Sequence, residues 1–96
     1  MHARITYYQL VDGATDKALD VWKEKVGPSL KQAKGFKGAY VIGNPNTGKG
    51  VTVTLWETED DMKATDATMP QTLALFDGMF AAQPDQEAME VLYQIS

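Results

Sequence analysis

Cysteine is absent from this 96-residue sequence, and histidine and arginine occur once each, as His2 and Arg4. Without cysteine there is no disulfide, no thiolate nucleophile and no cysteine-ligated metal site. A single imidazole next to a terminus excludes a Ser-His-Asp arrangement and a His-rich metal centre. We therefore expect no metal site in this chain.

Basic residues are outnumbered by acidic ones, nine to thirteen, which gives a net charge of −4 and an isoelectric point near 4.7. Nucleic acid is not an expected partner, because phosphate binding needs a basic face. Six of the eight lysines fall between Lys17 and Lys37, but Asp20 and Glu24 are interleaved with them. This mixture is typical of a solvated helix face.

No apolar run approaches the ~20 residues that a membrane span requires, and the N-terminal segment MHARITYYQLVDG contains no apolar leader. We expect a cytoplasmic protein without membrane contact. Hydrophobic residues make up 44% of the chain, and its length fits one domain over residues 1–96. A chain of this mass buries roughly 64% of its unfolded surface, so its own core is modest.

The first half of the chain predicts a strand, a helix and a strand. His2 to Val11 is rich in Ile, Thr, Tyr and Val. Thr15 is a suitable cap for a helix that carries an apolar stripe and that Gly35 ends. Gly27-Pro28 predicts a kink in this helix, because proline lacks the N–H and clashes with the preceding turn. Phe36 to Ile42 has the composition of a second strand.

The second half predicts a strand, a helix and a last strand. Gly50 to Glu57 is the third strand, and the turn-rich segment Asn44–Lys49 joins it to the second in a hairpin. Thr58 caps the second helix, whose first turn is acidic, and Met69-Pro70 divides that helix in two. Ala88 to Ile95 alternates apolar and polar residues and is predicted as the last strand.

The hairpin turn also contains the pattern G-x-x-x-x-G-K, over Gly43–Lys49. A phosphate-binding loop needs Ser or Thr next, where this chain has Gly50, and it needs a helix to follow, where this chain has a strand. The pattern therefore predicts a turn and not a phosphate site.

This order of elements predicts an α+β, ferredoxin-like βαββαβ fold, an antiparallel sheet with two helices on one face. The third strand offers Val51, Val53 and Leu55 to one side and Thr52, Thr54 and Trp56 to the other. Both faces carry apolar or aromatic area, yet the helices can cover only one. We expect a second copy of the chain to cover the other, in a homodimer through the sheet face.

Three segments resemble a known family. Gly35-Phe36-Lys37-Gly38-Ala39-Tyr40, the Asn-Thr-Gly-Lys turn and Leu55-Trp56-Glu57-Thr58-Glu59-Asp60 are similar to the antibiotic biosynthesis monooxygenase (ABM) domains. The resemblance covers the whole chain in element order and implies a dimeric α+β barrel. It also implies either oxygenation of quinol- or anthrone-like aromatics without a cofactor, or haem degradation.

The resemblance assigns candidate site residues and limits the activity. Trp56 matches a tryptophan that lines the family's pocket between the second helix and the sheet. Thr6 or Tyr8, depending on the alignment, stands where haem degraders and one oxygenase type have asparagine. Asp66 stands where haem degraders have their axial histidine, and a late arginine of the oxygenase type has no counterpart. Haem degradation is therefore disfavoured.

We predict a cofactor-independent monooxygenase for a small aromatic or quinol-like metabolite, which must exclude water, hold a ring and stabilise an oxyanion. The candidate catalytic residues are Trp56, Tyr8 and Asp66, the last as a base if it is buried. The candidate substrate-binding residues are Thr6, Tyr40, Thr54, Phe76, Met79 and Phe80. Each also has a structural explanation, as core packing, strand aromatic or solvated helix residue. The alternative function is a non-catalytic dimeric module that binds a small apolar ligand.

Overall fold

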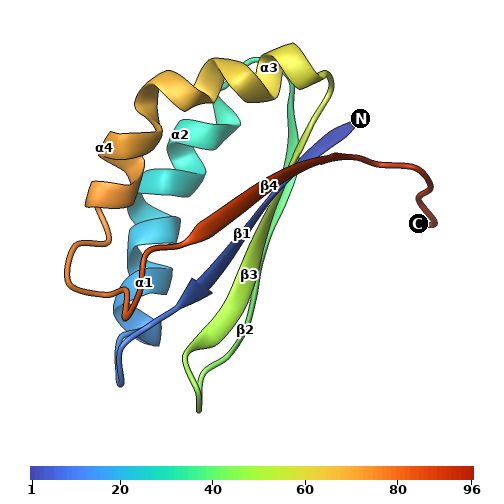
Figure 1. Cartoon of the computed structure of the whole chain (residues 1–96). Coiled ribbons are helices and arrows are strands. Elements are labelled where there is room, and N and C mark those ends of the chain that lie inside the picture. Colours follow the sequence, from blue (N-terminus) through green and yellow to red (C-terminus); the bar gives the residue numbers. More distant parts are fainter.

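The computed structural model describes all 96 residues as one antiparallel sheet with helices packed on a single face (Figure 1). Its four strands are β1 (His2–Gln9), β2 (Phe36–Asn44), β3 (Lys49–Trp56) and β4 (Asp85–Glu90), in the spatial order β2-β3-β1-β4. Every neighbouring pair is antiparallel. The predicted α+β ferredoxin-like arrangement is confirmed.

The first helical segment changes its winding next to proline, where the kink was predicted. It consists of α1 (Thr15–Val21), the π-helical turn η1 (Trp22–Val26) and α2 (Gly27–Lys31). The wider π turn accommodates the missing N–H and the bulk of Pro28. The predicted cap is wrong by one residue, because Ala14 is the N-cap without a side-chain bond and Thr15 already belongs to the helix.

The second helical segment begins and breaks where its local chemistry predicts. It consists of α3 (Glu59–Lys63), the 3₁₀ turn η2 (Ala64–Thr68) and α4 (Met69–Ala74). The Asp61 N–H donates to the Thr58 hydroxyl oxygen at 3.1 Å, which caps α3. Pro70 lies in the first turn of α4, where a missing N–H costs little.

The last strand was predicted too far along the chain. It spans Asp85–Glu90 and not Ala88 to Ile95, because its partner β1 begins at His2, which pairs with Glu90. The Val91 N–H donates to the Met1 carbonyl oxygen, and beyond this bond the last segment forms no backbone pairs with β1. Residues 91–96, the C-terminal tail, therefore leave the sheet (Figure 1). The first strand is likewise shorter than predicted, since Leu10 forms only an isolated bridge to Phe80.

The buried core of one chain is small. Eight of 96 residues are buried, and none of them is polar. Five form a cluster between the first helical segment and the 75–79 turn: Leu10, Ala14, Ala18, Val26 and Phe76. Trp56 and Met62 are the most completely enclosed large side chains, at the other end of the helical layer. A core this thin gives the isolated subunit little apolar stabilisation.

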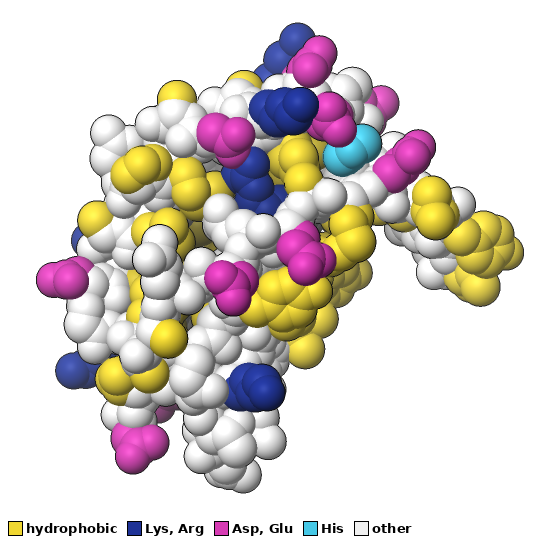
Figure 2. Space-filling model, viewed as in Figure 1, with side chains coloured by type: hydrophobic (Ala, Val, Ile, Leu, Met, Phe, Trp, Pro, Cys, Tyr) yellow, Lys and Arg dark blue, Asp and Glu magenta, His cyan; other side chains and the backbone are white.

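The sheet face without helices, here called the open face, is apolar. Strand register puts on it the side chains of Ile5, Tyr7, Tyr40, Ile42, Val51, Val53, Leu55 and Met89. Tyr40 is 62% exposed and Ile42 54% exposed. The C-terminal tail adds Leu92, Tyr93 and Ile95, each more exposed still. The tail stands away from the rest of the molecule and ends in hydrophobic side chains (Figure 2). None of the helices has the length and hydrophobicity of a membrane-spanning segment.

Candidate functional site

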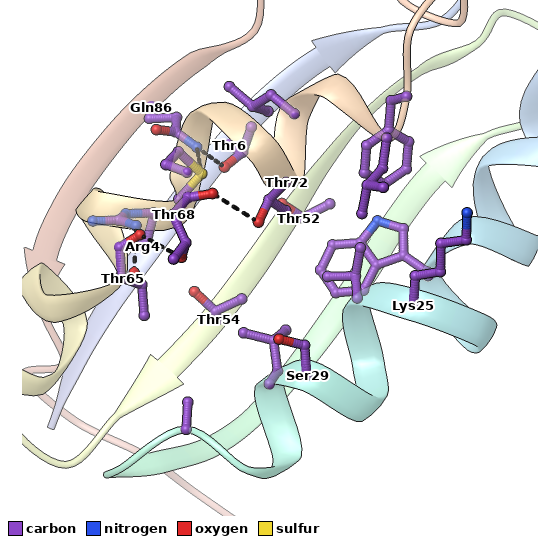
Figure 3. A pocket seen from close by; sticks show the side chains of 18 of the residues that line it. Arg4, Thr6, Lys25, Ser29, Thr52, Thr54, Thr65, Thr68, Thr72 and Gln86 are labelled. Atoms are coloured by element: carbon purple, nitrogen blue, oxygen red, sulfur yellow. Dashed lines mark hydrogen bonds between the residues drawn. The ribbon is translucent and has the colours of Figure 1, made fainter.

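A cavity of about 220 Å³ lies between the two helical segments and the sheet (Figure 3). The sheet supplies its floor through every second residue of β1 and β3, because alternate side chains share one face. The first helical segment forms one wall and the second helical segment the other. The lining residues are Arg4, Thr6, Tyr8, Trp22, Lys25, Val26, Ser29, Leu30, Ala33, Thr52, Thr54, Trp56, Thr65, Thr68, Met69, Thr72, Leu73, Leu75, Phe76, Phe80 and Gln86.

One end of the cavity is aromatic, and the other is polar apart from Trp56, which pairs with His2 in register. Tyr8, Trp22 and Phe80 pack against the buried cluster around Phe76, whose ring centroid lies 5.6 Å from that of Phe80. At the polar end, the Gln86 Nε2 donates to the Thr6 hydroxyl oxygen at 3.2 Å, and Arg4 lies near Thr65 (Figure 3). Sequence reasoning assigned the apolar slot to the second helix alone, whereas Trp22 and Leu30 of the first helical segment contribute equally.

Arg4 is the main functional candidate that sequence reasoning missed. Its guanidinium donates to the Thr65 hydroxyl oxygen at 2.9 Å and to the Asp66 carboxylate, and its side chain is only 10% exposed. The sequence contained one signal for it: Arg4 shares a strand face with Thr6 and Tyr8, so it points inward wherever they do. A cation on an inward strand position is unusual and indicates a specific partner.

Tyr8 of β1 lies across a pair of glycines and reaches over β3 to β2. Gly43 and Gly50 face each other in register, and the Tyr8 hydroxyl donates to the Ile42 carbonyl oxygen at 3.2 Å. A Cβ on either glycine would collide with the Tyr8 hydroxyl. Burial raises the pKa of Tyr8 above its ordinary value, so the phenol stays neutral and acts as a donor.

Gly43→Ala is expected to destabilise the protein by about 1–2 kcal/mol through overpacking against Tyr8. In a Tyr8→Phe background the same change should cost less, because the collision with the hydroxyl is removed and the tightest remaining contact of the new Cβ is the Lys49 carbonyl oxygen at 3.3 Å. Urea unfolding of the wild type, both single variants and the double variant measures this coupling. An equal cost in both backgrounds would show that Tyr8 does not occupy this position.

Trp56 is enclosed and its polar atom is already paired. It is 1% exposed, its indole N–H donates to the Thr54 hydroxyl oxygen at 3.0 Å, and its ring meets Phe36 edge to face at 5.5 Å. The predicted role of Trp56 as an oxyanion donor would require breaking the bond to Thr54. Trp56 therefore has a packing role in the core whether or not it also has a role in the site.

Three predicted site residues lie outside the cavity. Tyr40 pairs with Val53 in register and points to the open face, since Ala39 and Val41 take the cavity side. Met79 packs against the buried cluster from the turn after α4. Asp66 does not meet the condition of burial, because its side chain is 63% exposed and pairs with Arg4. The remaining six, Thr6, Tyr8, Thr54, Trp56, Phe76 and Phe80, all line the cavity, and their roles stay predictions.

The cavity does not fit haem. None of its lining residues is a histidine, and the position expected for an axial ligand is the exposed Asp66. The one imidazole, His2, contacts Glu59 with 3.0 Å between Nε2 and Oε2. A hydrogen bond from Lys63 holds the pKa of Glu59 below its ordinary range, so this carboxylate stays charged and occupied. Neither group lines the cavity.

Comparison with known proteins gives one family. The sequence profile described as antibiotic biosynthesis monooxygenase matches residues 1–68, and a search among curated proteins found no match. Among solved structures, the cofactor-independent oxygenase SnoaB from Streptomyces nogalater superposes with a TM-score of 0.80 at 9% identity, over 98% of this chain and 95% of its own.

Two further structures have the same fold. The ActVA-Orf6 monooxygenase of Streptomyces coelicolor, in complex with nanaomycin D, gives a TM-score of 0.76 at 16% identity, with 99% and 90% of the two chains covered. The heme-degrader MhuD from Mycobacterium tuberculosis gives 0.74 at 16% identity, with both chains fully covered. At these identities the superpositions establish the fold and leave the reaction open, since one fold hosts both activities.

Proposed function

Because this chain belongs to the antibiotic biosynthesis monooxygenase family, we propose that it oxidises a small aromatic or quinol-like metabolite with dioxygen, without metal or flavin. The single observation that carries the proposal is the cavity with an aromatic end and a hydroxyl-lined floor. Such a cavity suits a flat ring with a few oxygen substituents. The monooxygenase neighbours of the same fold support the reaction class.

The proposed chemistry asks little of the protein. Deprotonation of a phenolic ring system to solvent gives an anion that passes one electron to dioxygen, and the two radicals combine to form a peroxide at a ring carbon. Loss of water leaves a carbonyl group, so a ring CH₂ and O₂ become C=O and H₂O. The substrate supplies all four electrons. The cavity contributes orientation, exclusion of water and donors for the developing oxyanion.

Tyr8 is the donor that we propose for this oxyanion. Burial raises the pKa of Tyr8 still further above neutral pH, so its hydroxyl keeps its proton, and its bond of 3.2 Å to the Ile42 carbonyl is long for a hydroxyl donor. A substrate oxygen at the cavity surface of Tyr8 would compete well for the same proton.

Metal-free protein is expected to consume dioxygen when given a hydroquinone or anthrone substrate. Tyr8→Phe should lower kcat about tenfold, the loss of one transition-state hydrogen bond, with little change in KM. An oxygen electrode on chelator-treated protein measures both. Tyr40→Phe, which removes a hydroxyl from the open face, is the matched control and should retain the wild-type rate. Dependence of the rate on added flavin or iron would contradict the mechanism.

A non-catalytic binding module is the second candidate, and one observation favours it. No aspartate, glutamate or histidine lines the cavity, so the protein offers no conventional general base there. Saturable binding of hydroquinones or naphthols without oxygen uptake across the panel would favour this function over the first.

We also propose that the active unit is a homodimer joined through the open face. An apolar surface of this extent on a chain with only eight buried residues is an unfavourable contact with water. The exposed apolar tail extends beyond the same sheet. A second copy would cover both, and a twofold contact is self-complementary by symmetry.

A further inference from the structure

We infer that the cavity takes an aromatic anion whose acidic oxygen, a carboxylate or a phenolate, binds to Arg4 while its ring occupies the aromatic end. This inference rests on the proposed function only for the assumption that the cavity is the ligand site. It adds a chemical class of ligand and a residue that selects it.

The charge of the cavity is opposite to that of the chain. The chain has thirteen acidic and nine basic residues, yet no acidic side chain lines the cavity, whereas Arg4 and Lys25 both do. Lys25 is exposed and lies well away from Arg4, across the cavity (Figure 3). Arg4 is therefore the enclosed cation of the site. Because the charged side chains of the lining are both cations, the cavity favours an anionic ligand over a cationic one.

Arg4 keeps guanidinium N–H groups that no protein group accepts. Its side chain is 10% exposed, while that of its partner Asp66 is 63% exposed and lies outside the lining. A guanidinium has five N–H donors, and Thr65 and Asp66 take two nitrogens with one bond each. Planar N–H groups that remain accessible are suited to a carboxylate or phenolate oxygen.

The floor next to Arg4 is rich in donors that lack acceptors. The hydroxyls of Thr6 and Thr54 accept bonds from Gln86 and Trp56, and no protein group accepts their own protons. The Thr52 hydroxyl makes no bond within the protein, and no buried side-chain polar atom is left without a partner, so this hydroxyl is open to the cavity. Three free O–H donors next to a guanidinium favour a ligand with several acceptor oxygens.

The distance between the two ends sets the shape of the ligand. Arg4 and Tyr8 lie four residues apart on β1, which is about 13 Å along the strand. Tyr8 belongs to the aromatic end with Trp22, Phe76 and Phe80. A fused-ring aromatic with one acidic group at its edge spans this interval. Arg4 would also favour the ionised form of a bound phenol, which the proposed oxidation requires.

Two probes that differ in charge and little in shape test the inference: 2-naphthoate and its neutral amide, 2-naphthamide. We expect the wild type to bind the acid about tenfold more tightly, the contribution of one charge-assisted hydrogen bond. Arg4→Met should abolish this preference by weakening the acid alone. Asp66→Asn should strengthen acid binding severalfold, because it removes the competing carboxylate. Lys23→Met, which removes an exposed cation of η1 outside the cavity lining, is the control and should keep the preference.

Isothermal titration calorimetry and naphthyl fluorescence measure binding without turnover, and circular dichroism checks that each variant is folded. Equal affinity for acid and amide, or binding of neither at millimolar concentration, overturns the inference. If Arg4→Met fails to fold, the Asp66→Asn variant provides the test. An affinity of this variant for 2-naphthoate that is equal to or below that of the wild type would contradict the proposed role of Arg4. A clear charge preference without oxygen uptake on any substrate would refute the proposed oxidation and leave this inference intact.

Discussion

Val53→Asp is expected to weaken self-association of the chain at least a hundredfold, and to convert the proposed dimer to monomers at micromolar concentration. Val53 lies at the centre of the open face, between Ile5 of β1 and Tyr40 of β2. An unpaired carboxylate in an apolar contact costs several kcal/mol, and about 2.8 kcal/mol corresponds to a hundredfold change in the dissociation constant.

Sedimentation equilibrium over a range of concentrations measures this effect. Gln71→Asp adds the same charge on the exposed surface of α4 and should leave the association unchanged. Circular dichroism separates loss of association from loss of folding. A wild-type chain that is a folded monomer at tens of micromolar would refute the homodimer, and so would a Val53→Asp variant that associates like the wild type.

Trp56→Ala is expected to lower the free energy of unfolding by about 3–5 kcal/mol. The side chain is almost completely enclosed, packs edge to face on Phe36 and donates to Thr54. Because a domain of this size is stable by only about 5–15 kcal/mol, this loss is a large fraction of the total. With eight buried residues, few other contacts compensate for it.

Trp56→Phe is the matched comparison. It keeps an aromatic ring against Phe36 and loses the hydrogen bond to Thr54. We therefore expect it to lower the free energy of unfolding by about 1–2 kcal/mol. Urea unfolding at one fixed protein concentration compares the three proteins, since association would add to the apparent stability. A cost below 1 kcal/mol for Trp56→Ala would contradict the enclosed position of this ring.

Local chemistry explains why most element boundaries were predictable. The Thr58 cap, the winding change before Pro28, the break at Met69-Pro70 and the Asn44–Lys49 turn depend on groups within a few residues of one another. The alternation of Thr52 and Thr54 with Val51 and Val53 likewise separates two strand faces without further information. These features depend on hydrogen bonds and backbone dihedral angles that are set by residues close by in the sequence.

The errors arose where a residue depends on a distant partner. The last strand ends at Glu90 because β1 begins at His2, a limit that lies nearly the whole chain away. Tyr40 was predicted in the pocket, but the face that it takes follows from its register with Val53 and from which side the helices pack. Asp66 was predicted as a base on the condition of burial, but it is exposed and pairs with Arg4, which lies sixty-two residues earlier in the chain.

The sequence by itself therefore determined the order of helices and strands, the family, and the two opposite faces of the sheet, because these follow from local propensity and from side-chain period. The tertiary structure alone decided that Arg4 and three threonine hydroxyls share a cavity free of carboxylates, with aromatic rings at its far end. That cavity exists only where helices from both halves of the chain close over the sheet. Because its lining residues come from segments far apart in the sequence, no single segment is sufficient to predict it.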